Sequence, residues 1–207
     1  MRVAQATSSS SVGLPIQSID ISAAWRDSAR AIGYAPLLLM HRPLLAFLLS
    51  LTAACSDELP TGAIEVWICA EGGCADRVIG LTTEADHRLW VAMFSFTDED
   101  VARALTDAGR RGVDVKVLLD STQAGQAPTI RRILGDGGVD FRLDGNSSLM
   151  HHKFAVVDSK FVATGSFNWT VNANRHNDEN LVILHSDEVT DTFADEFSRV
   201  WAEGRVP

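Results

Sequence analysis

The residues best suited to chemistry lie in one stretch of 18, from His151 to Asn168. His151 and Lys153 alternate, so on a strand they share a face. Gly165, Ser166 and Asn168 follow the next apolar run, where backbone N–H groups and the serine and asparagine side chains can converge on an anion. A nucleophile or base, a fixed cation and amide donors in one concavity are what phosphoryl chemistry requires. We therefore predict a phosphodiester site here.

Two neighbouring residues are assigned structural positions. Asp158 lies in a tight turn with Ser159 and Lys160, and we expect it to shape that turn rather than take part in chemistry. His152 faces the opposite side of the strand from His151, so we expect it to be packed or at the rim of the site.

The elements that position these residues follow from the apolar pattern. Near-continuous apolar runs alternate with amphipathic stretches, and the Thr97–Asp100 segment is typical of a capping box before a helix. Strands are expected at 64–68, 89–96, 113–119, 139–143, 150–157, 161–164 and 181–184, and helices at 75–85, 97–111, 127–134 and 187–203. This order predicts an α/β sandwich with a mixed, mainly parallel sheet flanked by helices.

Composition limits the class of protein. The chain has 207 residues, enough for one domain or for one domain and a removable segment. Its formal net charge of −9 excludes a generally basic, DNA-coating protein, so an anionic substrate must be held by a local cluster. Three cysteines exclude a disulfide scaffold, and no apolar run reaches the ~18 residues of a membrane-spanning helix.

The N-terminal part divides at two points. Residues 1–39 are expected to be unstructured or an extension upstream of a true start at Met40, and residues 40–55 have the basic, apolar and small-residue order of a secretory signal. A genuine N-terminal extension ending in a buried helix is the alternative. The small residues before Cys55 resemble the lipobox of bacterial lipoproteins, which implies lipidation of that cysteine. Residues 56–207 then form a single catalytic domain.

Removal of residues 1–54 changes charge and redox setting. That segment holds four arginines and two aspartates, so the remainder carries −11. Export implies an oxidising compartment. There, Cys69 and Cys74 either form a disulfide across a short loop or remain two small apolar residues. A zinc site is not expected, because no second Cys or His pair stands at ligand spacing.

The motif as a whole resembles the signature of the phospholipase D superfamily, His-x-Lys, four residues, Asp, six residues, Gly-Ser-x-Asn. The positions that fill it are His151, Lys153, Asp158, Gly165, Ser166 and Asn168. The wider similarity spans about residues 63–202 and is greatest to the bacterial members with one motif copy, typified by a non-specific endonuclease. The resemblance implies that His151 is nucleophile or acid, that Lys153 and Asn168 bind phosphate with help from Ser166, and that Glu179 orients the histidine.

The resemblance also implies a mechanism and partners. Hydrolysis would pass through a covalent phosphohistidine and need neither metal nor cofactor. Because two histidines are required and the chain has one motif copy, we expect a homodimer with one shared active site. The substrate is either nucleic acid, our first interpretation, or a phospholipid head group; a non-catalytic phosphate-binding protein is a third. The expected location is outside the cytoplasm, in the periplasm or anchored by lipid to the bacterial membrane.

Overall fold

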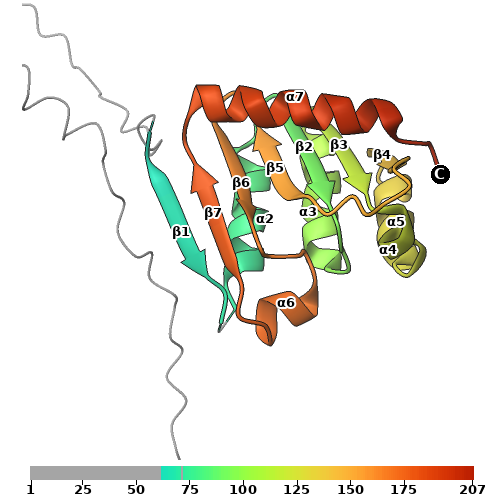
Figure 1. Cartoon of the computed structure of the whole chain (residues 1–207), viewed down its shortest axis with the longest axis horizontal. Coiled ribbons are helices and arrows are strands. Elements are labelled where there is room, and N and C mark those ends of the chain that lie inside the picture. The colour runs from blue at the N-terminus through green and yellow to red at the C-terminus, as the bar shows by residue number, and fades with distance from the viewer. Residues whose placement is uncertain (1–61, 71) are drawn as a thin grey trace, which may run out of the picture.

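The computed structural model describes residues 62–70 and 72–207 of this chain (Figure 1). The predicted upstream extension, the signal-like segment 40–55 and Cys55 lie outside the described residues. The described part forms one mixed sheet with helices on both faces, which confirms the predicted α/β class. No helix in this part has the length and apolar character needed to cross a membrane.

The sheet has seven strands within the described residues, in the spatial order β1-β7-β6-β5-β2-β3-β4. Their bounds are β1 Ile64–Ile68, β2 Arg88–Met93, β3 Asp114–Leu119, β4 Asp140–Leu143, β5 Lys153–Val157, β6 Phe161–Gly165 and β7 Asn180–Leu184. Only the pairs β2/β3 and β3/β4 are parallel; the other four pairs are antiparallel. The prediction of a mainly parallel sheet was therefore wrong. The tight turn after β5 returns β6 antiparallel, and the pairs β2/β5, β6/β7 and β1/β7 are antiparallel as well.

The helices form two layers (Figure 1). Their bounds are α2 Cys74–Glu84, α3 Glu99–Arg110, α4 Ser121–Gly125, α5 Pro128–Asp136, α6 Val171–Arg175 and α7 Asp187–Glu203. Helices α2, α3 and α5 pack on one face of the sheet, and α7 crosses the other. The helix predicted at 187–203 has those bounds, whereas the short helices α4 and α6 were not predicted.

Each face of the sheet has its own apolar core. The larger core joins the sheet to α2, α3 and α5, and the smaller joins it to α7. In the smaller core Phe197 stacks between Trp90 and Trp201, with ring centroids 5.3 Å apart on each side. Phe197 is fully buried, and burial of such a side chain contributes about 2 kcal/mol. This packing is what fixes α7 against the sheet.

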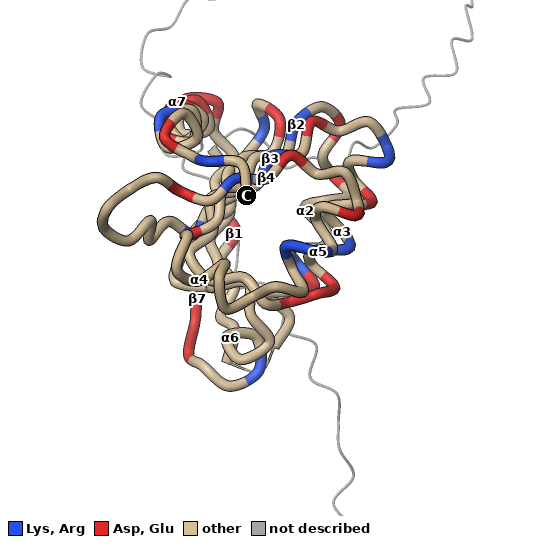
Figure 2. The backbone as a smooth tube through the Cα atoms, turned by 90° about the vertical axis from the view of Figure 1, so that its right-hand side faces the viewer, with Lys and Arg blue, Asp and Glu red and all other residues tan. Residues whose placement is uncertain are grey.

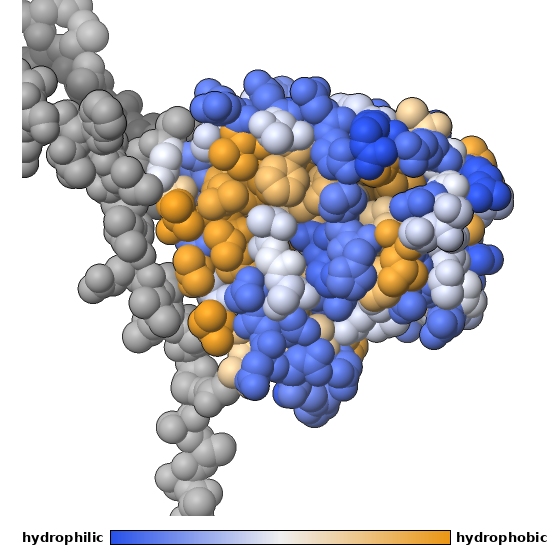
Figure 3. All heavy atoms as spheres, in the orientation of Figure 1, coloured by the Kyte–Doolittle hydropathy of each residue, from blue (hydrophilic) through white to orange (hydrophobic). Residues whose placement is uncertain are grey.

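Helix α7 leaves part of its sheet face uncovered. In Figure 3 apolar side chains lie in view over β1 and β7, below α7. On these two strands the half-buried Val66 and Val182 pair with each other, and Ile68, the last residue of β1, is 58% exposed. This surface reaches the end of the sheet at which β1 finishes and β7 begins.

Two local features bear on the sequence analysis: the residue that caps α3 and the pairing of Cys69 with Cys74. Asp98, not Thr97, caps α3: its carboxylate accepts hydrogen bonds from the N–H groups of Asp100 and Val101. Aspartate at this position satisfies two donors that the first turn leaves free. Cys69 and Cys74 form a disulfide that links the end of β1 to the start of α2.

Candidate active site

The motif residues gather at one end of the sheet. His151 lies just before β5, Lys153 is its first residue and Gly165 is the last residue of β6. Antiparallel pairing of β5 with β6 puts the start of the first beside the end of the second. Ser166 and Asn168 continue from β6 at the same end, so the predicted convergence of the two halves of the motif is present.

His151 and Lys153 are in contact, as their alternation predicted, although β5 begins only at Lys153. The Lys153 Nζ atom lies 3.3 Å from Nδ1 and 3.4 Å from Nε2 of His151. The ammonium is therefore nearly equidistant from the two ring nitrogens and is not directed at one of them alone. Lys153 is thus the partner that the described residues give this exposed imidazole, and its ammonium lies beside the ring.

Phe94, directly after β2, supports both groups. Its ring lies 4.4 Å from the imidazole of His151 and 5.0 Å from the Lys153 ammonium, measured to ring centroids. Lys153 also donates to the His151 carbonyl at 3.1 Å. Burial lowers the pKa of Lys153, and the opposing effect of the Glu179 carboxylate only partly offsets this shift. The result is a fixed cation beside an exposed imidazole.

The segment after β6 is held by β7. Ser166 Oγ donates to the Glu179 carboxylate and accepts from the N–H of Asn180 at 3.1 Å. Gly165 has φ +142°, and a Cβ at this position would lie 2.4 Å from the backbone oxygen of Asn180. Only glycine permits so close an approach of the two strands. The requirement for glycine in the motif is therefore a backbone requirement.

Asn168 lies between two buried aromatic residues. Phe167 and Trp169 are 2% and 3% exposed, and Trp169 packs edge-on against Phe96 with centroids 5.3 Å apart. Both rings therefore pack beneath the site, not on an open surface where a base could stack. The Asn168 Oδ1 atom is buried and has no hydrogen-bond partner within the described residues. The Oδ1 atom is therefore an unpaired acceptor, while phosphate would be bound by the Nδ2 donor of the same amide.

The structure places Glu179 beside Ser166. Its carboxylate also accepts from Asn177 Nδ2 at 2.9 Å, and no hydrogen bond joins it to His151 within the described part of the chain. Its charge also acts on Lys153, whose pKa it raises against the effect of burial. The orienting role implied for Glu179 stays a prediction.

Asp158 lies far from His151, at the opposite end of β5. It has φ +51° in the turn before β6, and its carboxylate accepts from the backbone N–H groups of Asp86, His87 and Arg88 at 3.0, 2.8 and 2.9 Å. Burial raises the pKa of this carboxyl, but the three donors and Lys160 outweigh burial and hold the pKa below its usual range. This position matches a structural role.

Asp120, at the end of β3, supports the segment before His151 and was not singled out from the sequence. It is 1% exposed, caps α4 through the N–H groups of Thr122 and Gln123, and accepts from the N–H of Met150 at 3.1 Å. A carboxylate that directly follows an apolar strand is a signal that could have indicated it. Within residues 62–70 and 72–207 no three His, Cys, Asp or Glu side chains are grouped as a metal site.

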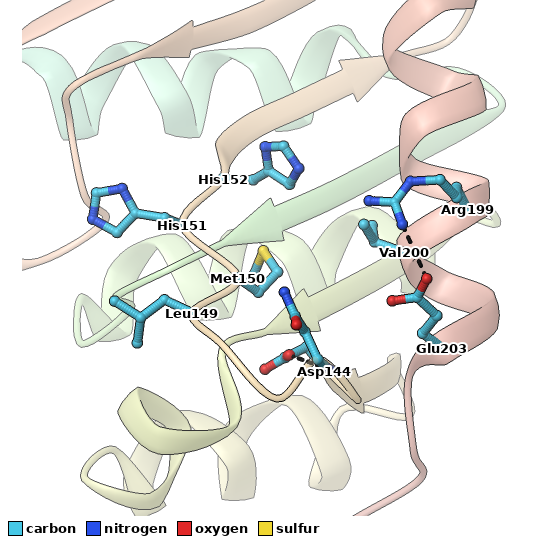
Figure 4. A pocket seen from close by; sticks show the side chains of 9 residues that line it. Asp144, Leu149, Met150, His151, His152, Arg199, Val200 and Glu203 are labelled. Atoms are coloured by element: carbon cyan, nitrogen blue, oxygen red, sulfur yellow. Dashed lines mark hydrogen bonds and ion pairs between the residues drawn. The ribbon is translucent and has the colours of Figure 1, made fainter.

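A pocket of about 330 Å³ lies beside the segment that carries His151, between residues 144–152 and α7 (Figure 4). His151 contributes to its rim, while its ring points away from Arg199. His152 points toward the α7 side of the segment, where its Nε2 lies 2.9 Å from Glu196 Oε1. The two adjacent histidines therefore face different surroundings, as the alternation of a strand predicts.

Comparisons with known proteins agree with this geometry. The family model described as "Cardiolipin synthase, PLD-like domain" matches residues 78–201. A mitochondrial cardiolipin hydrolase of Canis lupus familiaris is 32% identical over 151 residues, which are 73% of this chain and 56% of that protein. A phospholipase D of Rickettsia typhi is 28% identical over 136 residues, which are 66% of this chain and 67% of that protein.

A solved structure gives a further comparison. The phospholipase D family member Nuc from Salmonella typhimurium is 32% identical, with a TM-score of 0.65, and the match covers 69% of this chain and 95% of Nuc. By contrast, this chain spans little more than half the length of the cardiolipin hydrolases that it matches.

Proposed function

The chain belongs to the family of phospholipase D-like domains, and from this premise we propose that it hydrolyses phosphodiester bonds, with nucleic acid as the preferred substrate class. One observation carries the proposal: an exposed imidazole, a fixed ammonium and an asparagine amide with an unpaired oxygen occupy the same end of the sheet. These are the groups of His151, Lys153 and Asn168.

The proposed reaction has two steps. A ring nitrogen of one His151 attacks phosphorus, the bond from phosphorus to the leaving oxygen breaks, and a second histidine gives its proton to that oxygen. The second histidine then takes a proton from water, whose oxygen attacks the phosphohistidine and releases the phosphomonoester and free His151. Lys153 and Asn168 bind the non-bridging oxygens, where charge accumulates in each transition state.

We propose that the second histidine is His151 of another copy of the chain. A twofold axis brings a residue next to its own copy, so one motif per chain can supply both histidines. His151 is exposed and lies at an end of the sheet, where such an approach is open. Sedimentation of the purified protein should show a dimer, and full activity in a monomer would contradict this arrangement.

The choice of nucleic acid rests on similarity more than on charge. The match covers nearly the whole of Nuc, and the single motif copy resembles that of the bacterial endonucleases. Charge gives little help, since Lys and Arg are interleaved with Asp and Glu along the backbone and form no continuous basic stripe in view (Figure 2). Non-specific affinity for nucleic acid comes mainly from phosphate contacts, so we expect weak, salt-sensitive binding.

Phospholipid is the second candidate, and exposed apolar residues favour it. Ile68, Leu149 and Val171 are 58%, 56% and 45% exposed. They lie at the end of β1, two residues before His151 and three residues after Asn168, so all three belong to the catalytic end of the sheet. Such side chains can enter a lipid surface. The proposed export and lipidation of Cys55 would hold the enzyme near such a surface.

A single comparison tests both candidates. The protein and its His151→Ala variant are incubated, in excess EDTA, with plasmid DNA, single-stranded DNA and phospholipid vesicles. Cleavage of DNA by the parent alone supports the nuclease, and release of head groups or of phosphatidic acid by the parent alone supports the phospholipase. Activity retained by His151→Ala, or no cleavage of any substrate by a folded parent, would refute the proposed site.

A further inference from the structure

His151 is held from both neighbours along the chain. On one side the N–H of Met150 donates to Asp120, and on the other the carbonyl of His152 accepts from the N–H of Phe94 at 2.8 Å. The His151 side chain itself has no hydrogen-bond partner other than Lys153 in the part of the chain that the structure describes. The position of the imidazole is therefore decided by how firmly residues 150 and 152 are fixed.

His152 is fixed by its side chain as well as by its backbone. Its ring packs edge-on against Phe154, with centroids 5.2 Å apart, and its Nε2 lies 2.9 Å from Glu196 Oε1 on α7. Hydrogen bonds from Arg199 and from His152 outweigh burial and lower the pKa of Glu196 to about 2. The carboxylate is then ionised and can only accept, so Nε2 of His152 carries a proton and donates it to Glu196.

Glu196 is itself oriented. Arg199 donates to both of its carboxylate oxygens, from Nε at 2.7 Å and from Nη2 at 2.8 Å, and donates to Glu203 at 2.9 Å through Nη1. A guanidinium that engages both oxygens in this way fixes the plane of the carboxylate. A pocket lies between segment 144–152 and α7, and both His152 and Arg199 line it (Figure 4). The contact between His152 and Glu196 is therefore a direct polar link between this segment and α7.

We propose that Glu196 is a positioning residue for catalysis, which acts through His152 to fix the segment that carries His151. The inference rests on the proposed function, and it extends the site to α7, a helix that contributes no motif residue. His152 does not serve as the second catalytic histidine in this arrangement, because its Nε2 is bonded to Glu196 on the α7 side while Lys153 faces the other side.

The test compares acidic residues of one helix. In Glu196→Ala the His152 link is lost, and we expect kcat to fall about 10-fold with KM changed less than about 2-fold, since small displacements of a catalytic group reduce turnover. Glu196→Gln keeps an acceptor oxygen and should recover most of the parent kcat. Asp195→Ala removes the same charge from a neighbouring exposed position, and we expect parent activity.

A second variant and a second readout complete the design. His152→Phe keeps a ring against Phe154 without an N–H, so it should lose turnover like Glu196→Ala even if the alanine variant folds poorly. Parent kcat in both folded variants, or an equal loss in Asp195→Ala, overturns the inference while the proposed function stands. If the parent cleaves nothing, the proposed function fails instead. In that case NMR signals of the His151 ring decide: unchanged signals in Glu196→Ala overturn the inference, and shifted signals support it.

Discussion

Replacement of Asp158 tests whether the aspartate of the motif is structural. In Asp158→Asn one oxygen can still accept from His87 and Arg88, but an NH2 group replaces the oxygen that accepts from Asp86 at 3.0 Å. Two donors then face each other at a site only 5% exposed. One unsatisfied buried donor and the loss of charge cost about 2–3 kcal/mol in unfolding free energy. Asparagine tolerates the positive φ, so backbone strain adds little.

The lowered pKa of Asp158 predicts how the stability difference between the parent and Asp158→Asn changes with pH. The folded pKa of Asp158 lies below its ordinary value of 3.8. Its ionised form therefore contributes stability that is fully present above the unfolded pKa and is lost as pH falls through the folded pKa. The difference between parent and Asp158→Asn should be constant near pH 7 and shrink progressively below about pH 4.

Urea unfolding followed by circular dichroism at several pH values measures this difference, and the activity of the folded variant is measured at pH 7. We expect a midpoint shifted to lower urea with an unchanged slope, and kcat close to that of the parent. Equal stability at pH 7, or a stability gap unchanged down to pH 3, would show the hydrogen-bond argument to be mistaken. Loss of turnover in a fully folded variant would show a chemical role instead.

Two further predictions concern the ends of the same sheet. Gly165→Ala places a Cβ 2.4 Å from Asn180 O at φ +142°, so we expect a loss above about 2 kcal/mol and greatly reduced activity, whereas Gly125→Ala, with no atom within 4 Å, should resemble the parent in thermal unfolding. Reduction of the Cys69–Cys74 disulfide, at a sequence separation of 5, should lower stability by about 2 kcal/mol; a midpoint unaffected by reductant would contradict this.

Much of the framework could be predicted from the sequence because its signals are local. The strand 64–68 and the helix 187–203 have the predicted bounds: the first is a short run rich in β-branched and apolar residues, and the second has apolar residues at helical spacing. The short helices α4 and α6 could not be recognised in this way. Their apolar content is small, and their starts depend on single capping side chains, Asp120 and Thr170. The strand directions also needed the structure, because an apolar run has no direction of its own.

The residues of the candidate site likewise fall into those with a local sequence signal and those without one. His151, Lys153, Ser166 and Asn168 were found because chemistry fixes their types and spacing within one short stretch. Residues that support them are remote: Glu196 lies 44 positions from His152. Such a residue has no local pattern and is seen only when the fold brings α7 to the catalytic segment.

The position of β1 has a consequence for the order in which the molecule is built. This strand is the first of the described sheet, yet its sheet partner is β7, and the N–H of Gly62 bonds to His185 near the start of α7. During synthesis β1 therefore has no sheet partner until β7, more than a hundred residues later, has left the ribosome. The helix that covers the smaller core comes later still. Contacts so distant in sequence slow folding, and the complete sheet with both of its apolar cores can form only once synthesis has passed α7.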